Sequence, residues 1–355
     1  MVKKVEYAKK IIYTKLNDME WIDEAMTIND IARMAGVSIA TVSRVVNGKS
    51  VKKSTREAVV KAIEKSGYVP NAFARGLVTS ETTTVGVLIA DIADVFFASQ
   101  LSVVETELNK SGYNIIVVCI NEDMSDDMQK RQVQFLLGNH VAGIILIGPQ
   151  FANSAVQKYL EASNAQIPLI LLNDFSNTEN TYCVVADDAS AIAAAVKSLY
   201  EKGKRNFVYL YDRVNPSGLE KQKGFRDGVL ACGLAFRESQ LVRCVRSIKS
   251  AEEVTFKLLS GSMPVDAIIT AQDELAVGAL KAACRLKIDI PRALAIVGYN
   301  NSQICQSCTP ELSSIDNNVQ VSSKLAIDTF LRVIENQAVP NQILLSCCLI
   351  DRETT

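Results

Sequence analysis

From residue 84 onward, the chain alternates short apolar runs rich in β-branched residues with longer segments of helical pattern. The strand-like runs are, in order, TTVGVLIA, YNIIVVCI, AGIILIG, IPLILL, TYCVVA, NFVYLY, DAIIT and LAIVGY. Between several of them lie segments such as DVFFASQLSVVETELNKSG and DELAVGALKAACRL, with apolar residues at helical spacing. Continuous apolar strands separated by helices are typical of parallel sheets covered on both faces. The alternation therefore predicts an α/β, doubly wound parallel-sheet architecture.

Eight or more strands exceed the usual size of one sheet, so we expect two similar lobes. They form a predicted effector-binding and dimerisation domain over residues 83–355. Ligands of such sheets bind at the carboxyl ends of the strands, which places the expected site in the cleft between the lobes. Asp91 follows the first strand and is a candidate to line that cleft.

The segment TINDIARMAGVSIATVSRVVNG carries two short helical patterns joined by one glycine. Thr27 is expected to cap the first helix, with Asp30 as its reciprocal partner three residues on. Gly36 supplies the positive φ that ends this helix. Ser38 then caps a second helix, from Ile39 to about Val46. The spacing predicts two helices joined by a tight turn.

A third helix is expected to begin at STRE, where Ser54 and Glu57 have capping-box spacing. Together the three helices predict an N-terminal all-α helix-turn-helix domain over residues 27–70, whose second helix enters the major groove of DNA. A linker and hinge helix over residues 71–82 follow Pro70. This hinge helix is too short to be stable alone in water.

The exposed face of the second helix carries residues suited to DNA. The Arg44 guanidinium can make two bonds to a guanine edge, and Ile39 and Ala40 offer apolar contact to a thymine methyl. Short side chains suited to phosphate are Thr41, Ser43 and Asn47. Each residue alone is also common on an ordinary surface helix, but the spacing, the caps and the charge together favour DNA binding.

The net charge of −1 is unevenly distributed. Residues 27–80 carry nine Lys or Arg against three acids, a net charge of +6, while residues 1–26 carry five of each sign. The remaining residues, 81–355, therefore carry −7. A small basic domain beside a larger acidic one is expected where only one end of a protein meets phosphate.

The N-terminal 26 residues are broken by Lys throughout and do not have the pattern of a signal peptide. With no apolar run long enough to span a membrane, the chain is expected to be cytoplasmic. Its nine Cys lie mostly in apolar runs, which suits buried free thiols in a reducing compartment better than a disulfide framework. The extension, residues 1–26, reads as an amphipathic helix. Packing on a neighbouring domain or fraying in solvent is favoured over contact with DNA flanks or membrane.

Enzymatic and metal motifs are weak. Cys305 and Cys308 have metal-ligand spacing, but no second pair or His lies nearby in the sequence. The one His, His140, stands at a predicted turn, and no GxSxG, Walker or GxGxxG motif supports catalysis or a nucleotide cofactor. We expect no catalytic site, no metal and no cofactor.

TINDIARMAGVSIATVSRVVNG, followed by STREAVVKAIEKSGYVPNAFARGL, resembles the DNA-binding domain and hinge of the lactose-repressor/galactose-repressor (LacI/GalR) family. TVGVLIADIADVFF, ITAQDELAVGAL and the terminal LIDRETT resemble the body of that family, so the resemblance covers residues 27–355. It implies a two-lobed body like a periplasmic sugar-binding protein, a homodimer and a near-palindromic operator.

The resemblance also implies residue roles. Ile39, Ala40 and Arg44 occupy the base-reading positions. Leu77 takes the place of the leucine that wedges a central base step in the minor groove, with Ala74 alongside. The positions that contact the DNA backbone are Thr27, Ser38, Thr41, Ser43, Asn47 and Asn71.

In the effector cleft this sequence departs from the family pattern. Lys221 stands where an Arg commonly binds the ligand, and a Lys lacks the planar fork for bidentate recognition. Asn173 stands where many members have Asp, and Asn300 and Asn301 replace a usual Asp pair. Asp273 keeps the family's acid at the start of a helix, although an ordinary N-terminal cap explains it equally well. These departures favour either an unusual small ligand or a different trigger, and both stay open.

Three hypotheses follow. The first is an operator-specific homodimeric regulator, a repressor, controlled by a small molecule such as a sugar or a sugar phosphate. The second is a regulator whose body responds to a protein partner such as a phosphocarrier. The third is a cytosolic α/β enzyme or binding protein with an incidental N-terminal domain.

Overall fold

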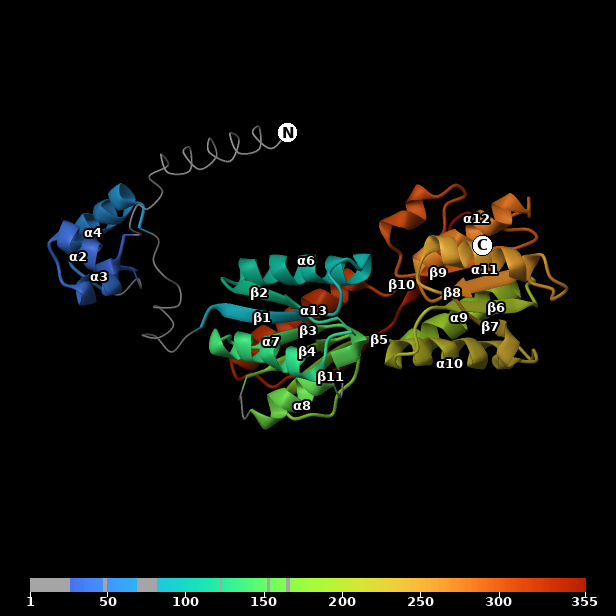
Figure 1. Ribbon diagram of the computed structural model, residues 1–355, viewed down its shortest axis with the longest axis horizontal. Coiled ribbons are helices and arrows are strands. Elements are labelled where there is room, and N and C mark those ends of the chain that lie inside the picture. Colours follow the sequence, from blue (N-terminus) through green and yellow to red (C-terminus); the bar gives the residue numbers. More distant parts are fainter. Residues whose placement is uncertain (1–25, 47–49, 69–81, 122, 152–153, 164–166) are drawn as a thin grey trace, which may run out of the picture. The chain divides into compact units, whose positions relative to one another are not determined.

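The computed structural model describes residues 26–46, 50–68, 82–121, 123–151, 154–163 and 167–355 (Figure 1). The chain divides into two compact units, Met1–Glu81 and Thr82–Thr355, and each is described by itself. Some predictions fall outside the described residues. They are the amphipathic helix of the N-terminal extension and the DNA contacts of Asn47, Asn71, Ala74 and Leu77.

The N-terminal unit is a three-helix domain. Its helices are α2 (Ile28–Ala35), α3 (Ile39–Val46) and α4 (Lys53–Ser66). Each contributes two side chains to a small apolar core, made of Ile31, Ala32, Val42, Val45, Val59 and Ala62. Because one face of each short helix is buried there, packing stabilises helices that would be marginal alone in water.

The helix ends follow the predicted chemistry at two of three starts. Thr27 and Asp30 form a capping box at the start of α2, and Gly36 ends that helix with φ 66°. The Ser38 hydroxyl accepts a hydrogen bond from the Thr41 amide, at 3.2 Å, at the start of α3. The prediction for the third helix is wrong, because α4 begins one residue earlier, after Lys52, with no side-chain cap.

The C-terminal unit, called the body here, consists of two lobes. Lobe 1 holds a six-stranded sheet in the order β11-β5-β4-β3-β1-β2, with parallel neighbours throughout. The strands are β1 (Thr84–Ile89), β2 (Asn114–Cys119), β3 (Ile144–Ile147), β4 (Leu169–Leu172), β5 (Thr181–Ala186) and β11 (Gln342–Leu345). The helices are α6 (Val95–Lys110), α7 (Asp126–Gly138), α8 (Ala155–Ala162) and α13 (Val319–Ile334), with the 3₁₀ turn η1 (Pro149–Phe151). Helices α6 and α13 pack together, as do α7 and α8, and the two pairs cover opposite faces of the sheet (Figure 1).

Lobe 2 repeats this architecture in the order β12-β10-β9-β8-β6-β7. The strands are β6 (Phe207–Tyr211), β7 (Leu241–Arg243), β8 (Ala267–Thr270), β9 (Ala295–Tyr299), β10 (Ser313–Asp316) and β12 (Cys348–Ile350). The helices are α9 (Asp188–Glu201), α10 (Pro216–Ala231), α11 (Ile248–Leu259) and α12 (Asp273–Arg285), with the 3₁₀ turns η2 (Glu238–Gln240) and η3 (Gln303–Ser307). Helices α9 and α10 pack together, as do α11 and α12.

The predicted two-lobed, doubly wound body is confirmed, and each of the eight predicted runs forms a strand. One strand departs from the predicted parallel arrangement, because β12 runs antiparallel to β10. It enters the lobe 2 sheet directly from β11 of lobe 1, from which it is separated by two residues, and not through a helical crossover within its own sheet.

The chain crosses between the lobes after β5, between β10 and α13, and between β11 and β12. Hydrogen bonds tie these crossings together: the Asp187 amide donates to the Leu345 carbonyl, and Asn318 Nδ2 donates to the Ser346 carbonyl, both at 2.8 Å. Asn318 is left-handed, with φ 56°. The crossings leave the carboxyl ends of the strands bordering a shared cleft.

Candidate nucleic-acid interface and interlobe cleft

Helix α3 buries one face and exposes the other. Val42 and Val45 lie in the core of the three-helix unit, whereas Ile39 is 49% exposed and Ala40 and Arg44 are exposed. Ala40 and Arg44 are one helical turn apart and so share a side of the helix. Thr41 and Ser43 are half-buried at the border of that surface.

The helix starts carry hydroxyls already used as caps. Ser38 Oγ lies 2.9 Å from Thr41 Oγ1, and Thr27 Oγ1 donates to the Asp30 carboxylate at 2.6 Å. The hydrogen bonds from Thr27 hold the pKa of Asp30 below its ordinary value. Both capping residues are exposed beside the positive ends of helix dipoles, an arrangement that suits a phosphate contact.

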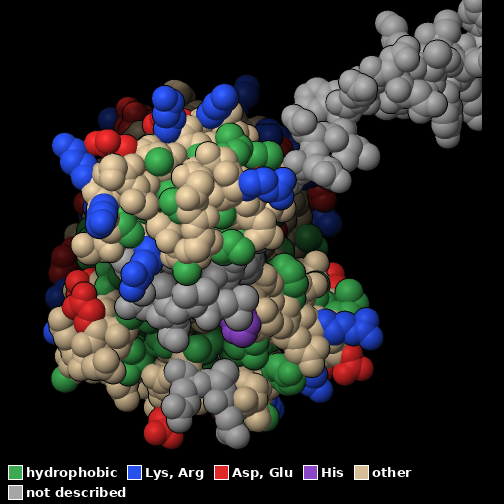
Figure 2. Space-filling model, turned by 90° about the vertical axis from the view of Figure 1, so that its left-hand side faces the viewer, with side chains coloured by type: hydrophobic (Ala, Val, Ile, Leu, Met, Phe, Trp, Pro, Cys, Tyr) green, Lys and Arg blue, Asp and Glu red, His purple; other side chains and the backbone are tan. Residues whose placement is uncertain are grey.

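The described part of the N-terminal unit is basic. Its cations are Arg33, Arg44, Lys52, Lys53, Arg56, Lys61 and Lys65, against Asp30, Glu57 and Glu64. Figure 2 faces this unit and shows Lys and Arg side chains spread over its surface. Such a charge distribution provides sequence-independent attraction to a nucleic-acid backbone.

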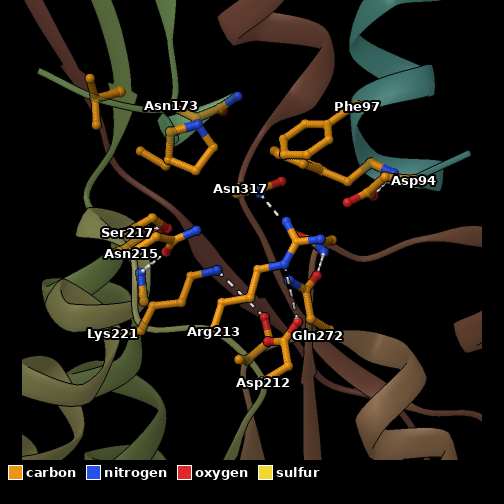
Figure 3. Close-up of a pocket in the computed structure, with 18 residues that line it drawn as sticks. Asp94, Phe97, Asn173, Asp212, Arg213, Asn215, Ser217, Lys221, Gln272 and Asn317 are labelled. Carbon is orange, nitrogen blue, oxygen red and sulfur yellow. Dashed lines mark hydrogen bonds and ion pairs between the residues drawn. The ribbon is translucent and has the colours of Figure 1, made fainter. Parts of the chain in front are cut away.

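The second candidate site is a cavity of about 60 Å³ between the lobes (Figure 3). Lobe 1 lines it with Asp94, Phe96, Phe97, Pro149, Asn173, Val185 and Ala186, and lobe 2 and the crossings with Asp188, Asp212, Arg213, Asn215, Ser217, Gly218, Lys221, Ala271, Gln272, Asn300 and Asn317. Three of the five predicted effector residues, Asn173, Lys221 and Asn300, therefore line one cavity. Its volume suits a few water molecules, so a larger ligand needs the lobes or side chains to move.

The hydrogen bonds of Asn173 explain why this position has Asn where many family members have Asp. Its side chain and that of the buried Gln100 form a reciprocal amide pair, with N···O distances of 2.8 and 3.1 Å. Its backbone is left-handed, with φ 74°, a conformation that Asn tolerates better than most residues. An Asp at this position could accept from Gln100 but could not donate to it.

Asn300 belongs to a chain of amides that lines the cavity. Asn317 Nδ2 donates to Asn300 Oδ1 at 3.0 Å, and Asn300 Nδ2 donates to Gln272 Oε1 at 2.7 Å. Asn301 faces a different group: its Oδ1 accepts from Arg352 Nη2 at 2.6 Å. The amide chain gives the cavity wall both donors and acceptors without a net charge.

Lys221 is buried, 7% exposed, and its Nζ lies 3.6 Å from the centroid of the Tyr299 ring. The Tyr299 hydroxyl donates to Asp188, which also accepts from Ser217. Burial, together with the charge of Asp188, raises the pKa of Tyr299 well above its ordinary value, so this phenol stays neutral. Lys221 thus brings a positive charge to the cavity, held by an aromatic face rather than by a carboxylate hydrogen bond.

Asp273 and Asp91 do not line the cavity. Asp273 is 1% exposed; its Oδ1 accepts from Ser314, and its Oδ2 accepts from the amide and hydroxyl of Ser302. Burial raises its pKa. These bonds tie α12 to the loop after β9, so the structure favours the structural reading of Asp273 over ligand contact. Asp91 accepts from the Ala93 amide at 2.9 Å in the turn after β1.

Sequence reasoning missed several lining residues, chiefly Asp94, Asp212, Arg213, Gln272 and Asn317. The last four directly follow strands β6, β8 and β10. The rule that ligands bind at the carboxyl ends of parallel strands would have identified those after β6 and β8. Two buried oxygens there, Asp212 Oδ2 and Asn317 Oδ1, accept no hydrogen bond from the described residues.

An ion pair joins the lobes at the cleft. Arg246 follows β7 in lobe 2 and pairs with Asp94, the N-cap of α6 in lobe 1. The same guanidinium lies 3.6 Å from Glu274. Burial disfavours the charged form of Arg246, but the hydrogen bond and charge of Asp94 outweigh that effect and raise its pKa. The guanidinium is therefore always charged.

Among the described residues, no His, Cys, Asp or Glu cluster could hold a metal ion, and no helix is long and apolar enough to cross a membrane. All nine cysteines are free, but only Cys183, Cys244 and Cys305 are buried, so the expectation of buried thiols holds for three of them.

Two family models match the chain. "Bacterial regulatory proteins, lacI family" matches residues 27–71, and "Periplasmic binding protein-like domain" matches residues 196–355. A relative described as an HTH-type transcriptional regulator, from Lachnoclostridium phytofermentans, is 34% identical over 333 residues, which cover 93% of this chain and 99% of the relative. Catabolite control protein A of Priestia megaterium is 33% identical over 324 residues, covering 90% of this chain and 96% of that protein.

A solved structure has the same fold. The lac repressor dimer, bound to operator and the anti-inducer ONPF, matches with a TM-score of 0.84 at 23% sequence identity. The match covers 93% of this chain and 99% of that one.

Proposed function

Because the chain belongs to the lacI family of bacterial regulatory proteins, we propose that it represses transcription as a homodimer bound to a near-palindromic operator, under the control of a small molecule in the interlobe cleft. Proteins of this family are DNA-binding transcriptional regulators, so the protein is a regulator of this kind and not an enzyme.

The exposed face of α3 supports the proposal that the protein reads the bases of an operator. Ile39, Ala40 and Arg44 project from a helix whose other face is locked into the core, which holds their positions relative to a groove. Arg44 can read a guanine, and the two apolar side chains can contact a thymine methyl. Phosphate contacts are proposed for Thr27, Ser38, Thr41, Ser43, Asn47 and Asn71, with Leu77 and Ala74 entering the minor groove.

The cleft supports the proposal for a small-molecule effector. Asn173, Lys221 and Asn300 meet there with two buried oxygens, Asp212 Oδ2 and Asn317 Oδ1, that accept no hydrogen bond from the described residues. The lac repressor in the matched structure is a dimer and carries both an operator and an anti-inducer, which supports the same arrangement for this chain. Effector binding would bias the closure of the lobes, a coupling typically worth about 1–3 kcal/mol.

Selection of bound duplexes from a random pool tests this function. The expected result is an enriched near-palindrome that the full-length protein binds as a dimer, as measured by sedimentation of the complex. Its affinity should change about 5- to 150-fold when the correct metabolite of a panel is added. Binding with no sequence enrichment would overturn the proposal, and so would enrichment of a single half-site bound by a monomer.

A further inference from the structure

A second and larger cavity, called the arginine groove here, adjoins the interlobe cleft in lobe 2. It measures about 700 Å³ and is open to solvent. Its walls are two loops, residues 212–215 after β6 and residues 243–246 at the end of β7. The loops lie side by side because β6 and β7 are parallel neighbours, with Tyr211 opposite Arg243. The groove shares Asp212, Arg213 and Asn215 with the cleft, so one ligand can occupy both.

The arginine groove is basic within an acidic body. Arg213, Arg243 and Arg246 line it, against Asp212, whereas residues 81–355 together carry a net charge of −7. Arg243 is exposed at the end of its strand, and Arg213 pairs with Asp212 at 3.8 Å. Guanidinium groups bind phosphate and carboxylate with two parallel hydrogen bonds.

Two long helices begin at this groove. Asn215, in its wall, caps the 16-residue α10, and Ser247, next to Arg246, caps the 12-residue α11. The positive ends of both helix dipoles therefore add to the charge of the arginines.

The buried acceptors indicate the rest of the ligand. Asp212 Oδ2 lies in the wall shared by groove and cleft, on a side chain that is 3% exposed. Arg213 Nε is 3.8 Å away, and no described residue donates a hydrogen bond to this oxygen. Asn317 Oδ1, on a side chain near the middle of the cleft lining in Figure 3, likewise accepts no hydrogen bond from the described residues. Buried acceptors need donors, and a ligand hydroxyl is a donor that fits beside a carboxylate and an amide.

We propose that the effector is a carbohydrate that bears a phosphate or carboxylate group, with its hydroxyls in the interlobe cleft and its anionic group in the arginine groove. This rests on the proposed small-molecule control of the regulator and adds the chemical class of the ligand and a second subsite. Because Arg246 also pairs with Asp94 of lobe 1, the anion binds beside the ion pair that joins the lobes.

Titration calorimetry with the full-length protein tests the proposal without DNA. The probes are matched sets: hexoses, their 6-phosphates and the corresponding aldonates and uronates, with inorganic phosphate alone. We expect one anionic member to bind at least about tenfold more tightly than its neutral parent, since a charge-assisted hydrogen bond is typically worth that factor or more. Arg243→Ala should reduce that advantage about tenfold and leave the affinity of the neutral parent unchanged.

Arg292→Ala is the matched control, because Arg292 is an exposed arginine just before β9, at the opposite end of the same sheet. It should alter neither affinity, and thermal unfolding checks that both variants fold. Equal affinity for neutral and anionic sugars, loss of both ligands in Arg243→Ala, or binding of no anionic sugar would overturn the proposal. So would Arg243-dependent binding of a phosphoserine peptide in place of sugars. Operator selection is measured separately, so an operator response to a neutral sugar would overturn this inference and leave the regulator function standing.

Discussion

At the scale of single residues, hydrogen-bond partners explain why the cleft has Asn at two positions where Asp would look like a conservative exchange. The pair between Asn173 and Gln100 uses both a donor and an acceptor on each side, so a carboxylate cannot replace the amide. Asn300 likewise accepts from Asn317 and donates to Gln272. The sequence marked Asn173 and Asn300 as departures, but their partners lie 73 and 17 or more residues away and no local pattern identifies them.

Arg44→Ala tests base reading by α3. The substitution removes an exposed guanidinium and leaves the buried face of the helix intact, so folding is expected to be unaffected. Affinity for the selected operator should fall by about 1–3 kcal/mol, with relaxed preference at one base pair per half-site. Competition binding with single-base operator variants measures both effects.

Lys52→Ala is the companion variant. Lys52 is exposed just before α4 and carries a single ammonium charge, which cannot make the two-bond contact of a guanidinium. Its loss should weaken binding to all DNA sequences alike and reduce the salt dependence of binding. If Arg44→Ala lowered the affinity for all sequences equally, as Lys52→Ala is expected to do, a base-reading role for Arg44 would be contradicted.

Asp174 provides a pH test of stability. It is 8% exposed, burial raises its pKa from 3.8 to about 6, and its Oδ2 has no partner among the described residues. The folded state therefore holds the proton more tightly than the unfolded state, and stability falls as pH rises from about 4 to 6. The cost at neutral pH is at most about 3 kcal/mol, from two pKa units at 1.4 kcal/mol each.

Asp174→Asn should therefore stabilise the body at pH 7.5 and change little at pH 4, where the wild-type carboxyl is protonated. Denaturant unfolding across this pH range measures the difference. Asp227→Asn, an exposed acid on α10, should stay within about 0.5 kcal/mol at every pH. A stabilisation that does not depend on pH would refute the titration of Asp174 as its cause.

At the scale of elements, hydrophobic pattern found eight strands, including β2 at the edge of its sheet, and missed four short ones. β10 reads SSID, yet Ser313 and Ser314 are both 0% exposed. Their polar groups bond Thr354, Thr355 and Asp273, contacts that only the folded chain supplies. β7 and β12 have three residues each, and β11, QILL, has three apolar residues, so none presents a run of apolar residues long enough to predict a strand.

Close packing of α9 on α10 depends on Gly224. A Cβ added there would lie 2.2 Å from the Ala189 carbonyl oxygen and 2.7 Å from its Cα, which are backbone atoms that cannot rotate away. Gly224→Ala should therefore push the helices apart and destabilise the body by about 1–3 kcal/mol or more, despite the better helix propensity of Ala. Urea unfolding of the full-length protein measures the loss.

Gly138→Ala is the matched control in a helix. Gly138 ends α7, and a Cβ there would meet nothing within 4 Å among the described atoms. The expected change is a neutral to favourable one of up to about 1 kcal/mol. Equal effects of the two substitutions would show that helix propensity, and not interhelical contact, dominates at Gly224.

At the scale of the whole body, the sequence predicted the two lobes and the edge of the strands that lines the cavity, but not which side chains meet across the cleft. Asp94 and Arg246 lie 152 residues apart, and nothing local to either residue indicates the other. Their contact depends on the crossings, which bring the N-terminus of α6 to the loop after β7. The pairing of such residues is a property of the closed body and follows from its topology.

Asp94→Asn isolates the contribution of this pair to closure. Asn can still accept from the Phe96 amide as the N-cap of α6, so the helix start is retained while the charge facing Arg246 is lost. Asp94 is 3% exposed, so removing its charge should cost the closed state about 1–3 kcal/mol. Open lobes would then be populated about tenfold or more above the wild type.

Hydrogen exchange of the full-length protein measures that shift. We expect faster exchange in the amides at the start of α6 and in the loop after β7, which close over each other, with the strand cores unchanged. Glu252→Gln is the control, since it removes a carboxylate that pairs with Lys281 and Arg285 within lobe 2. Unchanged exchange in Asp94→Asn would show that the crossings alone hold the lobes closed. Faster exchange in both variants would assign the effect to lost charge in general, and faster exchange confined to Asp94→Asn to the contact between the lobes.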